Sequence, residues 1–125
     1  MAAETVPDER FEELLSVACV RDRAAGIRWY EAFFGRPADE VIGEEALWRV
    51  GSDAYLVVDE RPERAGACTI TFAVRRLDAM LERMAAAGIR PEHAERYANG
   101  VHHVTIVDPD GNSLSLAEAP PGSAP

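Results

Sequence analysis

Residues 15–34 read LSVACVRDRAAGIRWYEAFF, an apolar run followed by a segment in which apolar residues recur at helical spacing. The run at 15–20 is typical of a β-strand, and the spacing after it predicts a helix over residues 23–34. Asp22 is a residue type that caps the first turn of a helix, and Gly35 is one that ends a helix. This stretch therefore predicts a strand and a helix joined by a very short connection.

The same order of events recurs about 54 residues later in the chain. Residues 69–74, TITFAV, alternate between polar and apolar side chains as a half-buried strand does. A helix is predicted over residues 77–87, with an apolar stripe that includes two methionines, and Gly88 ends it. We interpret the methionines as core residues.

Short strands separated by turn residues follow each helix. They are predicted at residues 41–42, 46–50 and 55–58 in the first half, and at 95–98, 102–107 and 113–117 in the second. The chain is thus predicted to be an α+β protein of two βαβββ modules with mostly antiparallel sheet. A unit of about 50 residues buries too little surface to be stable alone, so both modules are expected to pack into one domain.

Four segments are predicted along the chain. They are a polar leader at 1–11, a first module at 12–62, a second module at 63–118, and a disordered tail at 119–125.

Composition narrows the class of function. The chain has 125 residues, 47% of them hydrophobic, and a formal net charge of −9. No apolar run is long enough to span a bilayer and the leader lacks the apolar core of a signal peptide, so we expect a cytoplasmic protein without membrane contact. The negative charge disfavours nucleic-acid binding. It either favours a cationic ligand or serves only solubility.

Three motifs resemble a known superfamily. They are VRD at 20–22 followed by WYEAFFG at 29–35, Val74 with LDA at 77–79 and AGI at 87–89, and DPDGN at 108–112 followed by Leu114 and Leu116. In this order and spacing they resemble the vicinal oxygen chelate superfamily, which includes glyoxalases, bleomycin resistance proteins and extradiol dioxygenases. The resemblance runs from about residue 14 to 118, and small bacterial members of the superfamily are the most similar. It implies that the sheets curl around a cup in which the active or binding sites lie.

The resemblance also places the ligands of the superfamily's divalent metal. The matching residues here are Leu15, Val57, Thr69 and Ser115. Aliphatic side chains offer no donor, and hydroxyl groups are weak neutral donors compared with imidazole and carboxylate. We therefore predict a protein without a metal or other cofactor.

Strand alternation, with its register taken from the motifs, predicts which side chains face the cup. They are Tyr55, Val57, Thr69, Thr71, His103, Thr105 and Ser115. Trp48 is added as an aromatic candidate, with packing between the modules or at a dimer interface as its alternative. His103 is either a general acid or base or a hydrogen-bonding wall residue, and His102 points to the opposite face.

Three functional hypotheses follow from these residues. The first is a metal-independent protein that binds a small organic molecule, cationic or aromatic, in the cup, with sequestration of that compound as its role. The second is a metal-free lyase or isomerase with His103 as proton shuttle. The third, disfavoured by the missing ligands, is a metal-dependent glyoxalase-type lyase or a dioxygenase. A homodimer is expected, since members of the superfamily commonly pair.

Overall fold

A computed structural model of the chain describes residues 8–122. Its elements are β1 (Leu14–Val20), α1 (Arg23–Phe34), β2 (Glu40–Ile42), β3 (Glu45–Val50), β4 (Ala54–Glu60), a 3₁₀ turn η1 (Pro62–Arg64), β5 (Thr69–Ala73), α2 (Leu77–Ala86), β6 (His93–Arg96), β7 (His102–Val107) and β8 (Ser113–Glu118). The order βαβββ therefore occurs twice, as predicted. Most of the predicted leader and the end of the predicted tail, residues 1–7 and 123–125, lie outside the described part of the chain.

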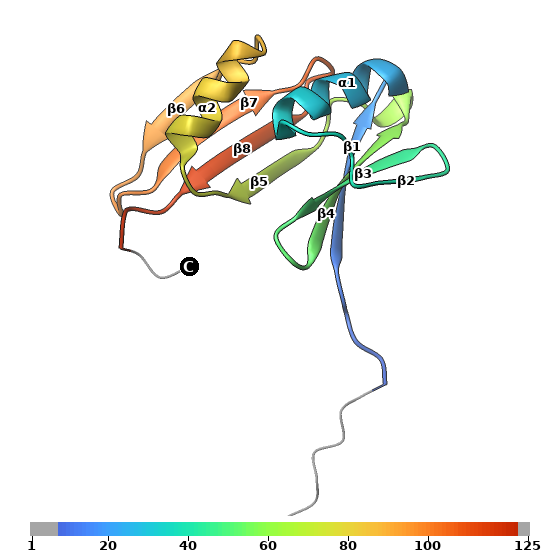
Figure 1. The fold of residues 1–125 in the computed structure, drawn as a ribbon, viewed down its shortest axis with the longest axis horizontal. Coiled ribbons are helices and arrows are strands. Elements are labelled where there is room, and N and C mark those ends of the chain that lie inside the picture. Colours follow the sequence, from blue (N-terminus) through green and yellow to red (C-terminus); the bar gives the residue numbers. More distant parts are fainter. Residues whose placement is uncertain (1–7, 123–125) are drawn as a thin grey trace, which may run out of the picture.

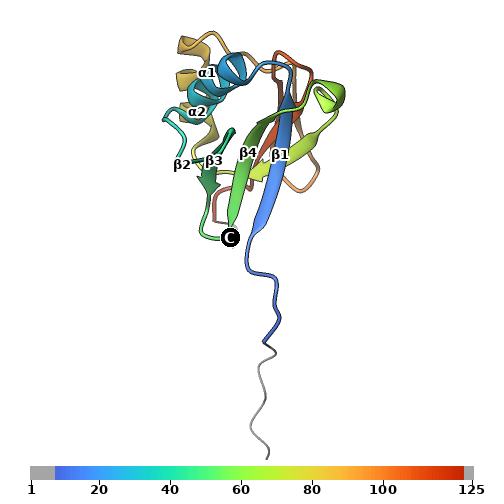
Figure 2. The ribbon, with the colours of Figure 1, turned by 90° about the vertical axis from the view of Figure 1, so that its right-hand side faces the viewer.

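Each module forms its own four-stranded sheet. The strand orders are β1-β4-β3-β2 and β5-β8-β7-β6, so the two sheets repeat the same topology. In each sheet the first and last strands of the module pair in parallel, and the other two pairings are antiparallel. The sheets lie side by side with α1 at their junction (Figure 1), and both helices lie on the same side of the sheets (Figure 2). The predicted α+β class with mostly antiparallel sheet is confirmed.

The ends of α1 form for the reasons that the sequence indicates. The Asp22 carboxylate accepts a hydrogen bond from the Ala25 amide at 2.8 Å, which satisfies one of the free donors of the first turn. Gly35 adopts a left-handed conformation with φ of 77°, a region that glycine enters without steric cost. Arg83 of α2 then donates to the carbonyl groups of Ala32 and Phe33, which joins α2 to the end of α1.

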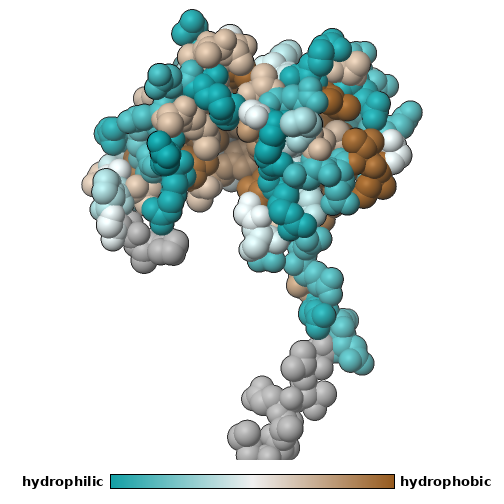
Figure 3. All heavy atoms as spheres, in the orientation of Figure 1, coloured by the Kyte–Doolittle hydropathy of each residue, from teal (hydrophilic) through white to brown (hydrophobic). Residues whose placement is uncertain are grey.

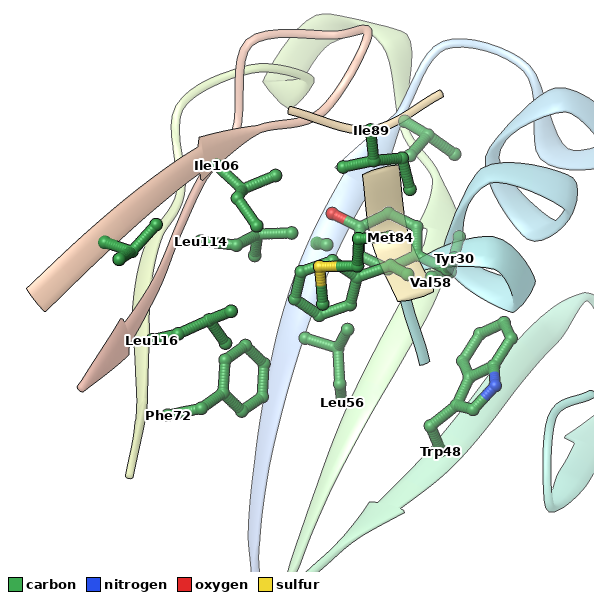
Figure 4. Close-up of a cluster of buried hydrophobic side chains, with 14 of the residues drawn as sticks. Tyr30, Trp48, Leu56, Val58, Phe72, Met84, Ile89, Ile106, Leu114 and Leu116 are labelled. Atoms are coloured by element: carbon green, nitrogen blue, oxygen red, sulfur yellow. The ribbon is translucent and has the colours of Figure 1, made fainter. Parts of the chain in front are cut away.

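One hydrophobic core lies between the helices and both sheets. Figure 4 shows Tyr30 of α1, Met84 of α2, Leu56 of β4 and Leu116 of β8 meeting in this cluster, and each is almost completely buried. The modules therefore share a single core, which explains why neither has to be stable alone.

A buried polar cluster fastens the two modules at the edge of this core. The Asp108 carboxylate accepts hydrogen bonds from the Tyr30 hydroxyl at 2.7 Å, the Asn112 side-chain amide at 2.8 Å, and the backbone amides of Asp110 and Asn112. Burial raises the pKa of the Tyr30 phenol and the neighbouring Asp108 charge adds to this, so the hydroxyl remains a proton donor. Tyr30 belongs to the first module and Asp108 to the second.

Asn112 uses its whole amide group in this cluster. Its Oδ1 accepts from the amides of Gly66 and Cys68 at 3.1 Å, and its Nδ2 donates to the Cys19 carbonyl at 2.9 Å as well as to Asp108. The DPDGN segment is therefore more than a turn between β7 and β8, because its buried side chains join β1, α1 and the start of β5.

Gly66 shows how closely the chain segments approach here. A Cβ atom built on Gly66 would lie 2.3 Å from the Asp110 carbonyl oxygen, and its φ is +89°. Any larger residue would push the DPDGN segment away from the linker between the modules.

The predicted position of β6 is wrong by two residues. The strand spans His93–Arg96 rather than 95–98, so it begins at His93. All four residues of β6 are exposed, which means that no alternation of apolar residues marks the strand. Its bounds depend instead on antiparallel pairing with β7, from His93 opposite Thr105 to Arg96 opposite His102.

Neither helix within residues 8–122 has the length and apolar character that crossing a membrane requires.

The polar cluster yields a stability prediction. We expect Tyr30→Phe to lower the free energy of unfolding by about 1.5–3 kcal/mol, because the buried Asp108 carboxylate loses a hydrogen-bond donor. Tyr97→Phe, at a half-exposed position, serves as the matched control and should change stability by less than about 0.5 kcal/mol. Urea denaturation measures both, and equal effects of the two substitutions would contradict this role for the cluster.

Candidate functional site

The candidate site is the face of the second sheet that points away from the helices. Val104, Ile106 and Leu116 lie in the core, so the alternate residues of β7 and β8 project from the opposite face. This open face carries Thr69, Thr71, His103, Thr105 and Ser115, together with Glu95. It is the polar wall of the expected cup, and we call it the polar face.

His103 is the residue of the polar face with the clearest unmet bonding capacity. Its side chain is 18% exposed, and among the described residues its Nδ1 is the buried side-chain nitrogen or oxygen that lacks a hydrogen-bond partner. The nearest charged atom is Oε1 of Glu95 at 4.0 Å, which is too far for a direct hydrogen bond. A buried polar atom without a partner is costly, so a bound water or ligand at this nitrogen would be stabilising.

Glu95 lies between two histidines and was missed as a site residue. Its Oε2 is 3.7 Å from Nε2 of His93 and its Oε1 is 4.0 Å from Nδ1 of His103. The pairing of β6 with β7 places Glu95 directly opposite His103. The Asn99-Gly100 turn signal indicates the hairpin but not its register, because counting outward from a two-residue turn would pair His103 with Arg96. The observed loop is centred on Asn99, and His103 therefore pairs with Glu95.

Tyr97 covers the same group of side chains. Its ring centroid is 5.3 Å from that of His103. Desolvation, with the nearby Glu95 carboxylate, raises the pKa of Tyr97 above that of a free tyrosine, so its hydroxyl remains protonated at neutral pH. Glu95, Tyr97 and His103 therefore combine a negative charge, an aromatic ring and an imidazole, and we call them the Glu95 cluster.

The rest of the polar face is made of hydroxyl groups. Thr105 and Ser115 share a hydrogen bond of 3.2 Å, and Ser115 is buried. Thr69 and Thr71 lie on β5, the edge strand of the sheet, and are exposed.

The corresponding face of the first sheet is apolar. Leu47, Tyr55 and Val57 form a small buried cluster of their own on it. The Arg49 guanidinium lies 4.8 Å from the centre of the Tyr55 ring and also donates to the Tyr55 hydroxyl. Since Arg49 already occupies that ring, Tyr55 has little surface left to stack on a ligand.

Trp48 does not belong to the cup, and its inclusion there is wrong. Its side chain is 0% exposed in the main core, stacks on Phe34 at 5.4 Å between ring centroids, and donates from Nε1 to the Arg36 carbonyl at 3.0 Å. It pairs with Leu56 across β3 and β4 and so shares the core-facing side of the sheet. Its position beside a turn gave no information about which face it takes.

The four residues at the superfamily's metal positions do not fit a divalent ion. Leu15 and Val57 offer no donor atom, and Thr69 and Ser115 offer only neutral hydroxyl groups. Within residues 8–122, no three or more His, Cys, Asp and Glu side chains gather in an arrangement that could hold a metal.

Comparison with known proteins identifies the family. No known protein-family profile and no curated protein matches the sequence. Among solved structures, a glyoxalase/bleomycin resistance protein from Catenulispora acidiphila is 36% identical, with a TM-score of 0.82 over 86% of this chain and 98% of that one. The chain is therefore a member of the glyoxalase/bleomycin resistance protein family, within the vicinal oxygen chelate superfamily.

More distant structures share the fold alone. A lactoylglutathione lyase from Agrobacterium tumefaciens is 22% identical, with a TM-score of 0.68 over 90% of this chain and 95% of that one. The oxidase ChaP-H2 is 18% identical, with a TM-score of 0.70 over 89% and 95%. Proteins described by such different activities show that the fold does not determine the reaction.

The contact between Glu95 and Tyr97 can be tested by titration. We expect Glu95→Gln to lower the pKa of Tyr97, because removing a nearby negative charge favours the tyrosinate ion. The measurement is the ultraviolet absorbance of tyrosinate as a function of pH. Subtracting the titration of a Tyr97→Phe variant made in the same background leaves the contribution of Tyr97 alone. Glu82→Gln on α2 is the control and should leave the titration unchanged. An unshifted Tyr97 in Glu95→Gln would mean that the two side chains do not interact in solution.

Proposed function

We propose that this protein binds a small organic molecule in the cup, without a divalent metal, and that the ligand is cationic or aromatic. The observation that carries the proposal is the Glu95 cluster, in which a buried imidazole nitrogen lacks a partner beside a carboxylate and an aromatic ring. A carboxylate with an aromatic face is a combination that attracts organic cations. The net charge of −9 favours the same class of ligand.

The cation would approach the Glu95 cluster rather than Tyr55. The Tyr55 ring already carries the Arg49 guanidinium, which would repel a second positive charge. Tyr97 is 43% exposed and has Glu95 as its charged neighbour. The apolar first-sheet residues and the polar face would then contact the hydrophobic and the polar parts of one ligand.

A second candidate function is favoured by Glu95. An imidazole with a carboxylate on the neighbouring strand is an arrangement that can accept and return a proton. Approach of the two side chains by about 1 Å would give a hydrogen bond that orients His103. This supports the alternative of a metal-free lyase or isomerase in which His103 is the acid–base residue.

Binding to the cup is tested with benzyltrimethylammonium as the probe and benzyl alcohol as its neutral analogue, in buffer containing a chelator. At low salt, we expect the cation to bind more tightly than its neutral analogue. His103→Ala should weaken binding by about 2- to 13-fold, the value of one hydrogen bond of roughly 0.5–1.5 kcal/mol. His102→Ala, on the opposite face of the same strand, is the matched control. Calorimetry or ligand-observed NMR provides the measurement.

Each outcome separates the hypotheses. Equal losses in the two histidine variants would overturn the assignment of the cup. Binding that appears only when the chelator is left out of the buffer would overturn metal independence. For any substrate that turns over, a fall in rate of about 100-fold or more in His103→Ala with little change in binding would favour the enzyme.

We further propose that a second copy of the chain covers the open face of the first sheet. Phe11 is fully exposed, and Leu14, Leu15 and Val17 on the edge strand β1 are 67%, 50% and 40% exposed. Grouped apolar side chains on an unpaired edge strand favour association. A partner at this place would close the apolar side of the cup.

The dimer is tested with two matched substitutions. We expect the wild-type protein to have the mass of a dimer by light scattering at micromolar concentration, and Val17→Asp to shift it toward a monomer. Val41→Asp places the same charge on β2, the opposite edge of the sheet, and should leave the dimer intact. A monomeric wild-type protein, or equal behaviour of the two variants, would contradict the proposal.

A further inference from the structure

A hollow lies on the side of the second sheet opposite the polar face. It has a volume of about 500 Å³ and lies where the N-terminus of α2 meets the ends of β6 and β7. The charged or titratable side chains around it are those of Arg75, Arg76, Asp78, Arg96, His102 and Glu118. His102 alternates with His103 along β7, so this hollow and the polar face of the cup occupy opposite faces of the same strand.

The segment that follows β8 forms one wall of the hollow. Pro120 and Pro121 line it together with Gly100 of the β6–β7 turn. A Cβ atom built on Gly100, whose φ is +91°, would lie 3.1 Å from the Pro120 ring. Pro120 therefore packs closely against Gly100, and this contact closes one side of the hollow.

Three arginines line the hollow, from the loop before α2 and from β6. Within residues 8–122, the guanidinium groups of Arg75, Arg76 and Arg96 take part in none of the ion pairs or side-chain hydrogen bonds. Arg96 lies directly opposite His102 in the β6–β7 pairing, which brings a guanidinium and an imidazole to one side of the sheet. Around this hollow, three positive charges that have no partner in the described part of the chain stand against a net charge of −9 for the whole sequence.

The two carboxylates of the hollow offset this charge only in part. Oε2 of Glu118 accepts hydrogen bonds from the backbone amides of Arg76 at 2.6 Å and Leu77 at 3.3 Å, so this group caps α2. These two amides are therefore already satisfied, and the binding proposed for the hollow does not depend on them. Asp78 is exposed in the first turn of α2, where a negative charge favours the helix dipole.

We propose that this hollow is a binding site for the phosphate group of a small molecule, separate from the cup. Guanidinium groups offer several donors in a planar fork that matches phosphate oxygens, and three arginines, from the loop before α2 and from β6, line this hollow. The volume of about 500 Å³ exceeds what one phosphate group fills, so there is room for an organic remainder. The site does not depend on the function of the cup.

The test is a titration with inorganic phosphate and, separately, with glycerol 3-phosphate at constant ionic strength, with chloride as the reference salt. We expect saturable shifts in amide NMR signals from residues 75–78, 96, 100–102 and 118–119. Arg75→Gln and Arg96→Gln should each weaken binding about 5-fold, which is about 1 kcal/mol at 1.4 kcal/mol per tenfold change. Arg28→Gln, an exposed arginine on α1, is the matched control and should bind as the wild type does.

The two probes distinguish the sources of the phosphate. Tighter binding of glycerol 3-phosphate indicates an organic phosphate ester, and equal binding indicates that the ion alone is recognised; both support the site. Shifts no larger than those caused by chloride, or equal losses in Arg28→Gln and Arg96→Gln, would overturn it.

Discussion

The arrangement of the two modules depends on the buried hydrogen bonds of Asp108 and Asn112. Together these side chains accept from Tyr30, Gly66 and Cys68 and donate to the Cys19 carbonyl, so they contact both modules and the linker between them. A buried carboxylate is tolerated only when its oxygens are hydrogen-bonded, and here Asp108 accepts four hydrogen bonds. Because these bonds have directions, they define how the modules meet in a way that the surrounding apolar contacts cannot.

The strand β7 connects the core with two different surfaces. Val104 and Ile106 anchor it in the core, and this places His103 on the polar face and His102 at the arginine-lined hollow. A shift of the β7 pairing by one residue would exchange the positions of the two histidines and turn Val104 and Ile106 out of the core. Burial of these apolar side chains therefore stabilises the observed register. The chemistry of both surfaces thus rests on the packing of one strand.

Family membership limits the possible functions without selecting one. Structures with the same fold are described as a resistance protein, a lyase and an oxidase. The function must therefore be argued from the side chains of this chain, among them the Glu95 cluster on β6, β7 and the turn between them. The proposed function therefore follows from these residues rather than from the fold.

The sequence alone determined the elements that have strong local signals. The strand-helix repeat, the Asp22 cap, the Gly35 stop and the alternation in β5, β7 and β8 all follow from the backbone preferences and the burial of neighbouring residues. Only the tertiary structure decided the bounds of the exposed strand β6, the burial of Trp48, and the approach of Glu95 to His103. These depend on pairing and packing between segments, and a strand whose residues are all exposed carries no apolar pattern from which its partner could be predicted. The role of Asp108 and Asn112 was hidden for a related reason: their turn is local, but the groups that they bind come from distant parts of the chain.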